Sequence, residues 1–202
     1  MLTIWGRLNS HNVKKVVWAA EEIGLDYIRH DVGGKFGMDE AYLALNPNAL
    51  IPTIEDNGLV LWESNAILRY LAHAHAPHLW PADPRERAAA DKWMDWQFGF
   101  ADAQRDVFLM LVRQPVERHD PAVIAKGSDA TARMMAMLDA LLAQQPWITG
   151  DSFGIADIPM GTYVHTWFTL AMPRPDFPHL RDWYERMTAR PGYADNVMIP
   201  LT

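Results

Sequence analysis

The sequence predicts an α/β domain followed by an all-α helical bundle. Two observations carry this prediction. Strand-like segments alternate with helical patterns early in the chain, and almost everything after residue 84 has helical periodicity. The segment HAPHLWPADP separates the two regions, because its three prolines interrupt any helix. We therefore expect an α/β domain at 1–76, a linker at 77–84 and a helical domain at 85–202.

The chain begins with a strand and a helix. Residues 2–5, LTIW, suit a short strand. From Asn12 onward, apolar side chains return at the spacing of one helical face: Val13, Val16, Val17, Ala20 and Ile23. Gly24 follows, and glycine ends many helices because it adopts left-handed backbone angles without strain.

The next segments are expected to complete a mixed sheet. Residues 26–32, DYIRHDV, alternate as a strand does, and the helix before them would make the first two strands parallel. A glycine-rich loop at 33–47 holds a short helix. Two apolar runs then flank Asn57-Gly58, the dipeptide that best suits a type I′ hairpin turn.

Helices account for the rest of the chain. Ser64 is expected to cap a helix that buries one apolar face, formed by Ile67, Leu68, Leu71 and Ala72. Beyond the linker, helical periodicity predicts helices at about 85–113, 121–145, 155–171 and 177–190.

Composition excludes several functions. The chain has 202 residues, a formal charge of -7 and no basic patch, so nucleic acid is not an expected partner. No apolar run approaches the ~20 residues that span a bilayer, which predicts no membrane segment and a cytoplasmic location. The absence of cysteine excludes disulfides, thiolate metal sites and a thiol nucleophile of the protein's own. Sulfur chemistry would need a thiol that arrives with a ligand.

Two polar clusters call for an explanation. Asn9, Ser10, His11 and Asn12 stand together where the first helix begins, although capping a helix needs only one such side chain. Ser10 either caps the helix or serves a ligand. The second cluster, HAHAPH, matches no trusted metal-ligand spacing, and no carboxylate or thiolate completes it, so we expect no metal.

The chain resembles the glutathione S-transferase family over essentially its whole length. The resemblance rests on SHNVKKVVWAAEEIGL, NPNALIPTIED and LWESNAILRYLA, with a weaker match at GDSFGIADIP. Residues 6–12 contain no tyrosine and the chain has no cysteine, so the resemblance is to bacterial serine-type members of theta or phi character. It implies a thioredoxin-like first domain that binds glutathione, a helical second domain that receives an electrophile, and a homodimer.

In the serine-type classes, the serine two residues before an Asn-Val pair donates a hydrogen bond to the glutathione sulfur. Here that serine is Ser10, with Asn12 as the second choice. Lowering a thiol pKa from ~8.5 to ~6.5 takes ~2.7 kcal/mol. A hydroxyl donor supplies ~1.5–3 kcal/mol and the helix N-terminus ~0.3–1 kcal/mol, so no base is required. His11 is a poor candidate for a base, because neighbouring side chains in a turn usually point apart.

The resemblance also implies the rest of a glutathione site. A cis Ile51-Pro52 bond would let Ile51 pair its backbone with the cysteinyl unit, although an X-Pro bond is trans by default and Pro52 could simply begin a strand. Ser64 would hold the γ-glutamyl carboxylate and Glu63 the ammonium; alternatively they form an ordinary helix start. Lys35 would bind the glycyl carboxylate or remain a solvated loop lysine. The second-substrate pocket would draw on helical-domain and first-loop residues: Leu8, Phe108, Met110 and Trp167.

The sequence departs from the family pattern at two places. Asn48-Ala49 stand where a glycine is usual, which could alter the turn before Pro52. Gly154 replaces the usual Ser or Thr three residues before Asp157, which puts Asp157 at the third helical position and, with Pro159, implies a loose helix start.

These observations predict a transferase that keeps glutathione ionised and conjugates it to small hydrophobic electrophiles, in detoxification, with glutathione as co-substrate and no metal. A glutathione-dependent peroxidase or disulfide reductase on the same fold is an alternative. A non-catalytic binding protein is another, because a fold does not guarantee chemistry.

Overall fold

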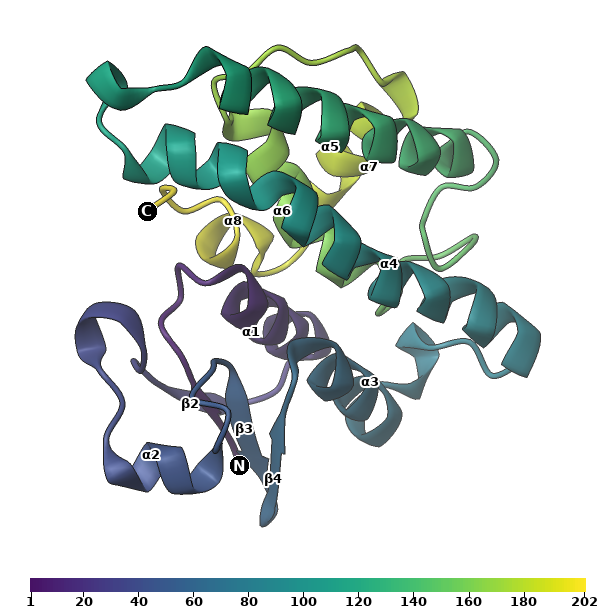
Figure 1. Ribbon diagram of the computed structural model, residues 1–202. Helices are drawn as coiled ribbons and strands as arrows, with labels where there is room; N and C mark the ends of the chain where they lie inside the picture. Colours follow the sequence, from purple (N-terminus) through teal and green to yellow (C-terminus); the bar gives the residue numbers. More distant parts are fainter.

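A four-stranded mixed sheet forms the base of the computed structural model, which describes all of residues 1–202 (Figure 1). The strand order is β2-β1-β3-β4. Strand β1 pairs in parallel with β2 and antiparallel with β3, which pairs antiparallel with β4, so the predicted mixed sheet is confirmed. The strands are β1 (Leu2–Trp5), β2 (Tyr27–His30), β3 (Thr53–Asp56) and β4 (Leu59–Trp62).

Three helices belong to the sheet domain, and local turn chemistry sets their limits. They are α1 (His11–Ile23), α2 (Glu40–Leu45) and α3 (Ser64–His75). Gly24 ends α1 with φ 75° and donates its N–H to carbonyl groups of the last turn, as predicted. Asn57 and Gly58 have φ values of 51° and 85°, which confirms the hairpin turn. Helices α1 and α3 pack against each other (Figure 1).

The predicted cap of α3 is wrong by one residue. Glu63 holds the cap position, with φ 74° and ψ 107°, and Ser64 is the first helical residue. Strand β4 ends at Trp62, so Glu63 alone makes the reversal between strand and helix. It does so in a left-handed conformation that is unfavourable for any residue with a Cβ.

The helical domain lies above the sheet domain in Figure 1. Its longest helix, α4, ends at Phe108 and is followed directly by a π-helical turn at residues 109–113, so the predicted helix at 85–113 is found in two parts. Proline occupies the first helical position of α4, α5 and α7, where its missing N–H has no intrahelical partner to lose. The helices are α4 (Pro84–Phe108), α5 (Pro121–Leu142), α6 (Asp157–Thr169), α7 (Pro178–Thr188) and α8 (Tyr193–Asn196).

The start of α6 is firmly anchored, contrary to the prediction of a loose start. Asp157 is the first helical residue rather than the third, and it is fully buried. Its carboxylate accepts hydrogen bonds from the Ile148 N–H at 2.7 Å, the Gly154 N–H at 3.1 Å and the indole N–H of Trp183 at 2.9 Å. Pro159 falls in the first turn, where no intrahelical donor is needed.

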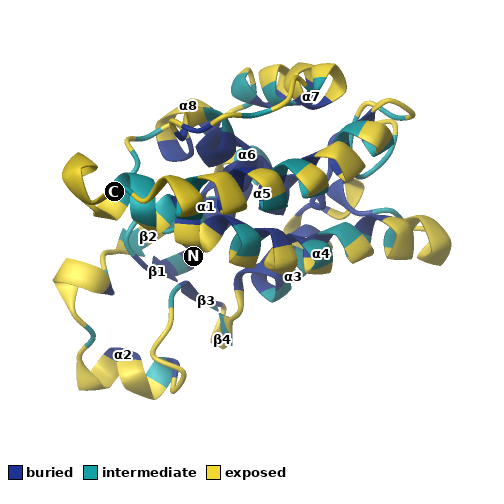
Figure 2. Ribbon diagram, turned by 45° about the horizontal axis from the view of Figure 1, so that its top comes forward, coloured by how far each residue is buried: buried dark blue, intermediate teal, exposed yellow.

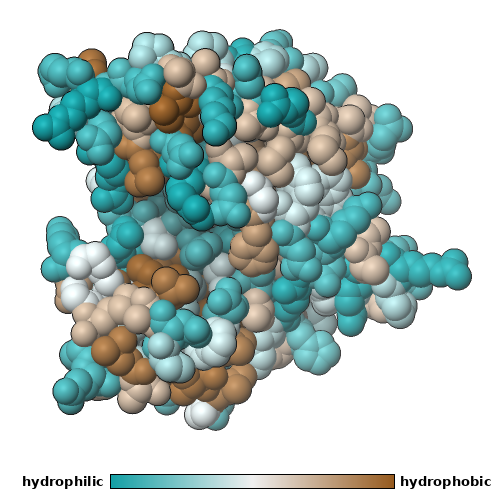
Figure 3. Space-filling model, viewed as in Figure 1, coloured by the Kyte–Doolittle hydropathy of each residue, from teal (hydrophilic) through white to brown (hydrophobic).

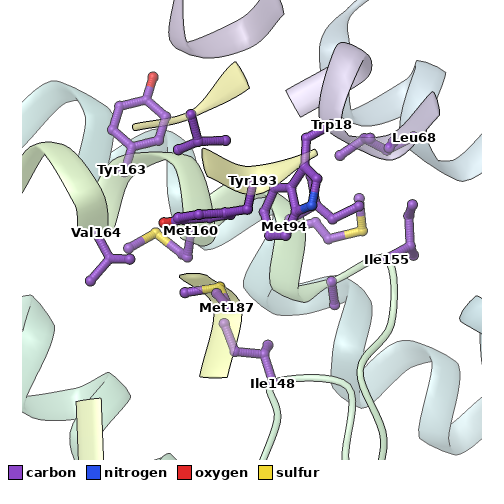
Figure 4. Close-up of a cluster of buried hydrophobic side chains, with 14 of the residues drawn as sticks. Trp18, Leu68, Met94, Ile148, Ile155, Met160, Tyr163, Val164, Met187 and Tyr193 are labelled. Carbon is purple, nitrogen blue, oxygen red and sulfur yellow. The ribbon is translucent and has the colours of Figure 1, made fainter. Parts of the chain in front are cut away.

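Helix α1 lies in the core between the two domains. Every residue from 13 to 20 is buried, because α3 covers one side of the helix while α6 and α8 cover another (Figure 2). Trp18 crosses the boundary and meets the ring of Tyr193 at 4.8 Å, beside Met160 and Met187 (Figure 4). The sequence pattern predicted one buried face for α1, whereas the helix is buried on more than one side. A single hydrophobic core extends through both domains.

None of the helices has the length and apolar character needed to cross a bilayer.

Candidate active site

A continuous cleft begins at the N-terminal end of α1 and runs between the two domains. It has three adjoining cavities of about 350, 170 and 310 Å³. The first two share the side chains of His11, Asn12, Phe108 and Tyr163. The last two share Arg7, Asn9, Arg113 and Thr202. We call these the inner, middle and outer cavities. Figure 3 shows the molecule hollowed between its upper and lower parts.

Ser10 lines the middle cavity with an uncommitted hydroxyl. The residue occupies the cap position of α1, but its side chain makes no capping hydrogen bond. Its backbone carbonyl accepts from the Lys14 N–H at 2.9 Å, as the helix requires. The hydroxyl is therefore free to donate to a ligand at the positive end of α1.

His11 is fixed as a neutral ring beside Ser10. Its imidazole stacks on Tyr163 with the ring centroids 4.5 Å apart, and Nε2 lies 2.7 Å from Oγ1 of Thr166. Burial, helped by the nearby Lys14 and Lys15 charges, lowers its pKa from 6.5 to about 3. A ring with so low a pKa is too weak a base to accept a proton at neutral pH. His11 therefore serves to line the cleft.

Asn12, Ser64 and Lys15 join the starts of α1 and α3. The Ser64 hydroxyl donates to Oδ1 of Asn12 at 3.2 Å. The Lys15 ammonium lies 3.3 Å from the Ser64 oxygen, 3.2 Å from Oδ1 of Asn65, and also donates to Gln97 of α4. Lys15 is fully buried, and burial lowers its pKa to about 7 against an opposing effect of the Glu63 carboxylate.

Sequence reasoning missed Lys15. The only signal was a lysine set between the apolar residues of the first helix, where a solvent-facing position is the ordinary expectation.

The Ile51-Pro52 peptide bond is cis, as the resemblance implied. Neither the N–H nor the C=O of Ile51 makes a backbone hydrogen bond within the chain, so both are available to a ligand. The loop before it is held by Asn46, whose Nδ2 donates to the Leu50 carbonyl at 3.0 Å. Ala49 takes φ 53° there, a left-handed angle that would suit the glycine of the family pattern.

The outer cavity brings three cationic side chains together. Lys35 lies beside Phe36, with Nζ 5.0 Å from the ring centroid. Arg7 and Arg113 line both the outer and the middle cavity. Burial, and then the charge of Arg113, lowers the pKa of Arg7. Neither arginine was expected at the site, because their meeting depends on how the two domains pack.

Of the four residues predicted for a second-substrate pocket, the structure brings Phe108 to the cleft. Trp167 is fully buried in the core and donates to Oγ1 of Thr131 at 3.1 Å, so its assignment to the pocket is corrected. Met110 contacts the Asp120 N–H through its sulfur at 3.4 Å, and Leu8 packs against the core. The side chains of His11 and Tyr163, which were not predicted for the pocket, line it together with Phe108.

Comparisons with known proteins agree over the whole chain. The family model for the glutathione S-transferase N-terminal domain matches residues 9–74, and the model for the C-terminal domain matches residues 121–186. Glutathione S-transferase GstB of Escherichia coli is 41% identical over 100% of both chains. The disulfide-bond oxidoreductase YfcG of the same bacterium is 32% identical over 90% of this chain and 87% of its own.

A solved structure is similar in both sequence and fold. The theta class glutathione S-transferase of Xanthomonas axonopodis pv. citri, with glutathione bound, superimposes with a TM-score of 0.95. It is 49% identical, over 100% of this chain and 99% of that one.

Proposed function

This chain belongs to the glutathione S-transferase family of enzymes, and we propose that it ionises glutathione beside Ser10 and transfers the thiolate to small electrophiles with an apolar body. The observation that carries the proposal is the uncommitted Ser10 hydroxyl at the N-terminus of α1, inside the cleft. A hydroxyl there favours an anion through its own hydrogen bond and through the helix end.

The remaining groups fit the rest of the tripeptide. Ser64, at the first position of α3, would receive the γ-glutamyl carboxylate, and Glu63 would pair with its ammonium. The free N–H and C=O of Ile51 would pair with the cysteinyl unit. Lys35 would pair with the glycyl carboxylate. Extended between these points, the ligand brings its sulfur to the middle cavity.

The residues contribute charge stabilisation and proximity. Ser10 donates to the thiolate, which attacks an electrophilic carbon held against Phe108 and Tyr163. In a substitution the new S–C bond replaces the bond to a leaving halide; in an addition the neighbouring carbon takes a proton from water. Because the reactants share one cleft, the attack is effectively unimolecular.

Ultraviolet titration of enzyme-bound glutathione tests the proposal. Ser10→Ala should raise the pKa of the bound thiol by roughly one unit or more, while Asn12→Ala should leave it nearly unchanged. An unchanged curve in Ser10→Ala, or a larger shift in Asn12→Ala, would contradict the assignment of the sulfur contact to Ser10.

A second candidate activity is the reduction of disulfides or hydroperoxides with glutathione. The similarity to YfcG, named a disulfide-bond oxidoreductase, favours it. Steady-state rates with an aryl halide, a hydroperoxide and a small disulfide, each at saturating glutathione, separate these activities. A halide rate at the uncatalysed level beside a fast disulfide rate would replace the transferase assignment.

The proposal extends to a homodimer with a detoxifying role in the cytoplasm. Strand β4 is an edge strand of the sheet, and it leaves the side chains of Leu59, Val60 and Trp62 exposed. Apolar side chains on an open edge are typical of an interface between chains. Light scattering should give twice the 23.0 kDa chain mass, and a monomer would contradict this part.

A further inference from the structure

The middle and outer cavities concentrate cationic side chains. Arg7, Lys35 and Arg113 are among the residues that line them, and no Asp or Glu is. The chain as a whole has a formal charge of -7, so this concentration of cations runs against its overall composition. Arginines that line a cleft without an Asp or Glu beside them favour an anionic ligand.

Arg7 is held in place but incompletely bonded. Its Nη1 donates to Oδ1 of Asn9 at 2.6 Å, whereas Nε is buried and has no hydrogen-bond partner. Gly34 lies directly against the guanidinium, since a Cβ there would stand 2.9 Å from Nε. A buried guanidinium N–H without an acceptor is energetically unfavourable. A ligand that brings an acceptor atom to Arg7 Nε would remove this cost.

Arg113 adds a second charge rather than a partner. Burial lowers the pKa of Arg7, and the nearby charge of Arg113 lowers it further, because the two guanidinium groups repel each other. Neither forms an ion pair, whereas Arg69, Arg105 and Arg190 each pair with a carboxylate elsewhere in the chain. A carboxylate between Arg7 and Arg113 would remove this repulsion and could be held bidentately.

The two arginines line the outer cavity and also the middle cavity, where the proposed thiolate lies. They share the middle cavity with Ser10, Phe108 and Tyr163, whereas Lys35 lines the outer cavity and not the middle one. Lys35 is therefore available to the glycyl carboxylate of glutathione in the outer cavity, whereas the arginines also border the middle cavity, where the reacting carbon would lie.

We propose that Arg7 and Arg113 together bind a carboxylate on the second substrate, so that the preferred electrophile is an organic acid, such as a halogenated or α,β-unsaturated carboxylic acid with a small apolar body. The proposal rests on the transferase function above and names its substrate class. The aromatic walls hold the apolar part, and the arginine pair orients the reacting carbon towards the sulfur.

A matched pair of electrophiles tests the proposal. The probes are 4-chloro-3-nitrobenzoate and 4-chloro-3-nitrobenzamide, with each kcat/KM divided by the uncatalysed rate with glutathione at the same pH. The enzyme should favour the carboxylate roughly tenfold or more, as expected for a charge-assisted bidentate contact. The double variant Arg7→Met/Arg113→Met should abolish this preference, read as the ratio of the two electrophiles within the same variant, because the carboxylate loses its partners. Arg118→Met, an exposed arginine outside the cleft, serves as the matched control.

The outcomes separate this proposal from the proposed function. An unchanged preference in the double variant would overturn it. So would a rise in the KM for glutathione that slows both electrophiles equally, because the arginines would then bind the glycyl carboxylate. If neither electrophile reacts although glutathione binds by calorimetry, the transferase function itself fails. Circular dichroism and melting curves exclude misfolding of the variants.

Discussion

The ammonium group of Lys15 lies 3.3 Å from the hydroxyl oxygen of Ser64, which itself donates to Asn12. The buried Lys15 amine therefore lies directly under the point where the γ-glutamyl carboxylate is proposed to bind. Through Gln97 it also ties that point to the helical domain. Lys15 is thus a positioning residue for Ser64.

Replacing Lys15 by Met should weaken glutathione binding. The KM for glutathione is expected to rise on the order of tenfold, because Ser64 loses a buried hydrogen-bond partner, while the pKa of the bound thiol stays nearly constant. Lys14→Met is the matched control, since Lys14 is equally buried but its ammonium donates to the Val197 carbonyl at 2.9 Å. Equal KM effects in the two variants would show a general loss of stability instead.

Glu63→Gly should stabilise the fold and impair the site. Glycine accepts the positive φ of position 63, which relieves roughly 1 kcal/mol of backbone strain and should raise the melting temperature. The proposed partner of the glutathione ammonium is lost, so the KM for glutathione should rise. Glu63→Ala removes the same carboxylate but keeps the strain; it should match the KM effect without the gain in melting temperature.

Acid should destabilise the protein through His11. Its pKa is about 3 in the folded chain and 6.5 when exposed, so between these values the unfolded state binds more protons. Stability is therefore complete above pH 6.5 and is lost as the pH falls towards 3, by roughly 3 kcal/mol at pH 4.

Urea unfolding of wild type and His11→Gln at pH 7, 5.5 and 4 checks this. The variant should show a flatter dependence on pH, with a remaining slope from His165, whose pKa burial lowers to about 4. Parallel slopes for the two proteins would contradict the assignment.

Asp157→Asn should lower stability by about 2–4 kcal/mol, because an amide cannot accept all the hydrogen bonds that converge on the buried carboxylate. Asp129→Asn, on the exposed surface of α5, should change it little. Chemical denaturation measures both. The KM for glutathione should be unchanged in the folded variant, because Asp157 lies outside the cleft.

Local chemistry made much of the fold predictable. Gly24 and Asn57-Gly58 end or reverse the chain through their own backbone preferences, so sequence alone locates them. The position of Glu63 was missed because a cap depends on where the preceding strand stops. Ser10 and Ile51 could be proposed as site residues through the family resemblance, whereas the burial of Lys15 depends on how α3 and α4 pack around α1.

The shared core around Trp18 has a consequence for how such enzymes diversify. A helical domain taken from a related protein would replace the substrate pocket and, at the same time, the residues that cover α1, the helix that Ser10 precedes. Chimaeras that join this sheet domain to another helical domain should therefore fold only when that domain can pack around the indole ring of Trp18. Exchange of domains within the family is therefore constrained by the packing around Trp18 as much as by the residues of the active site.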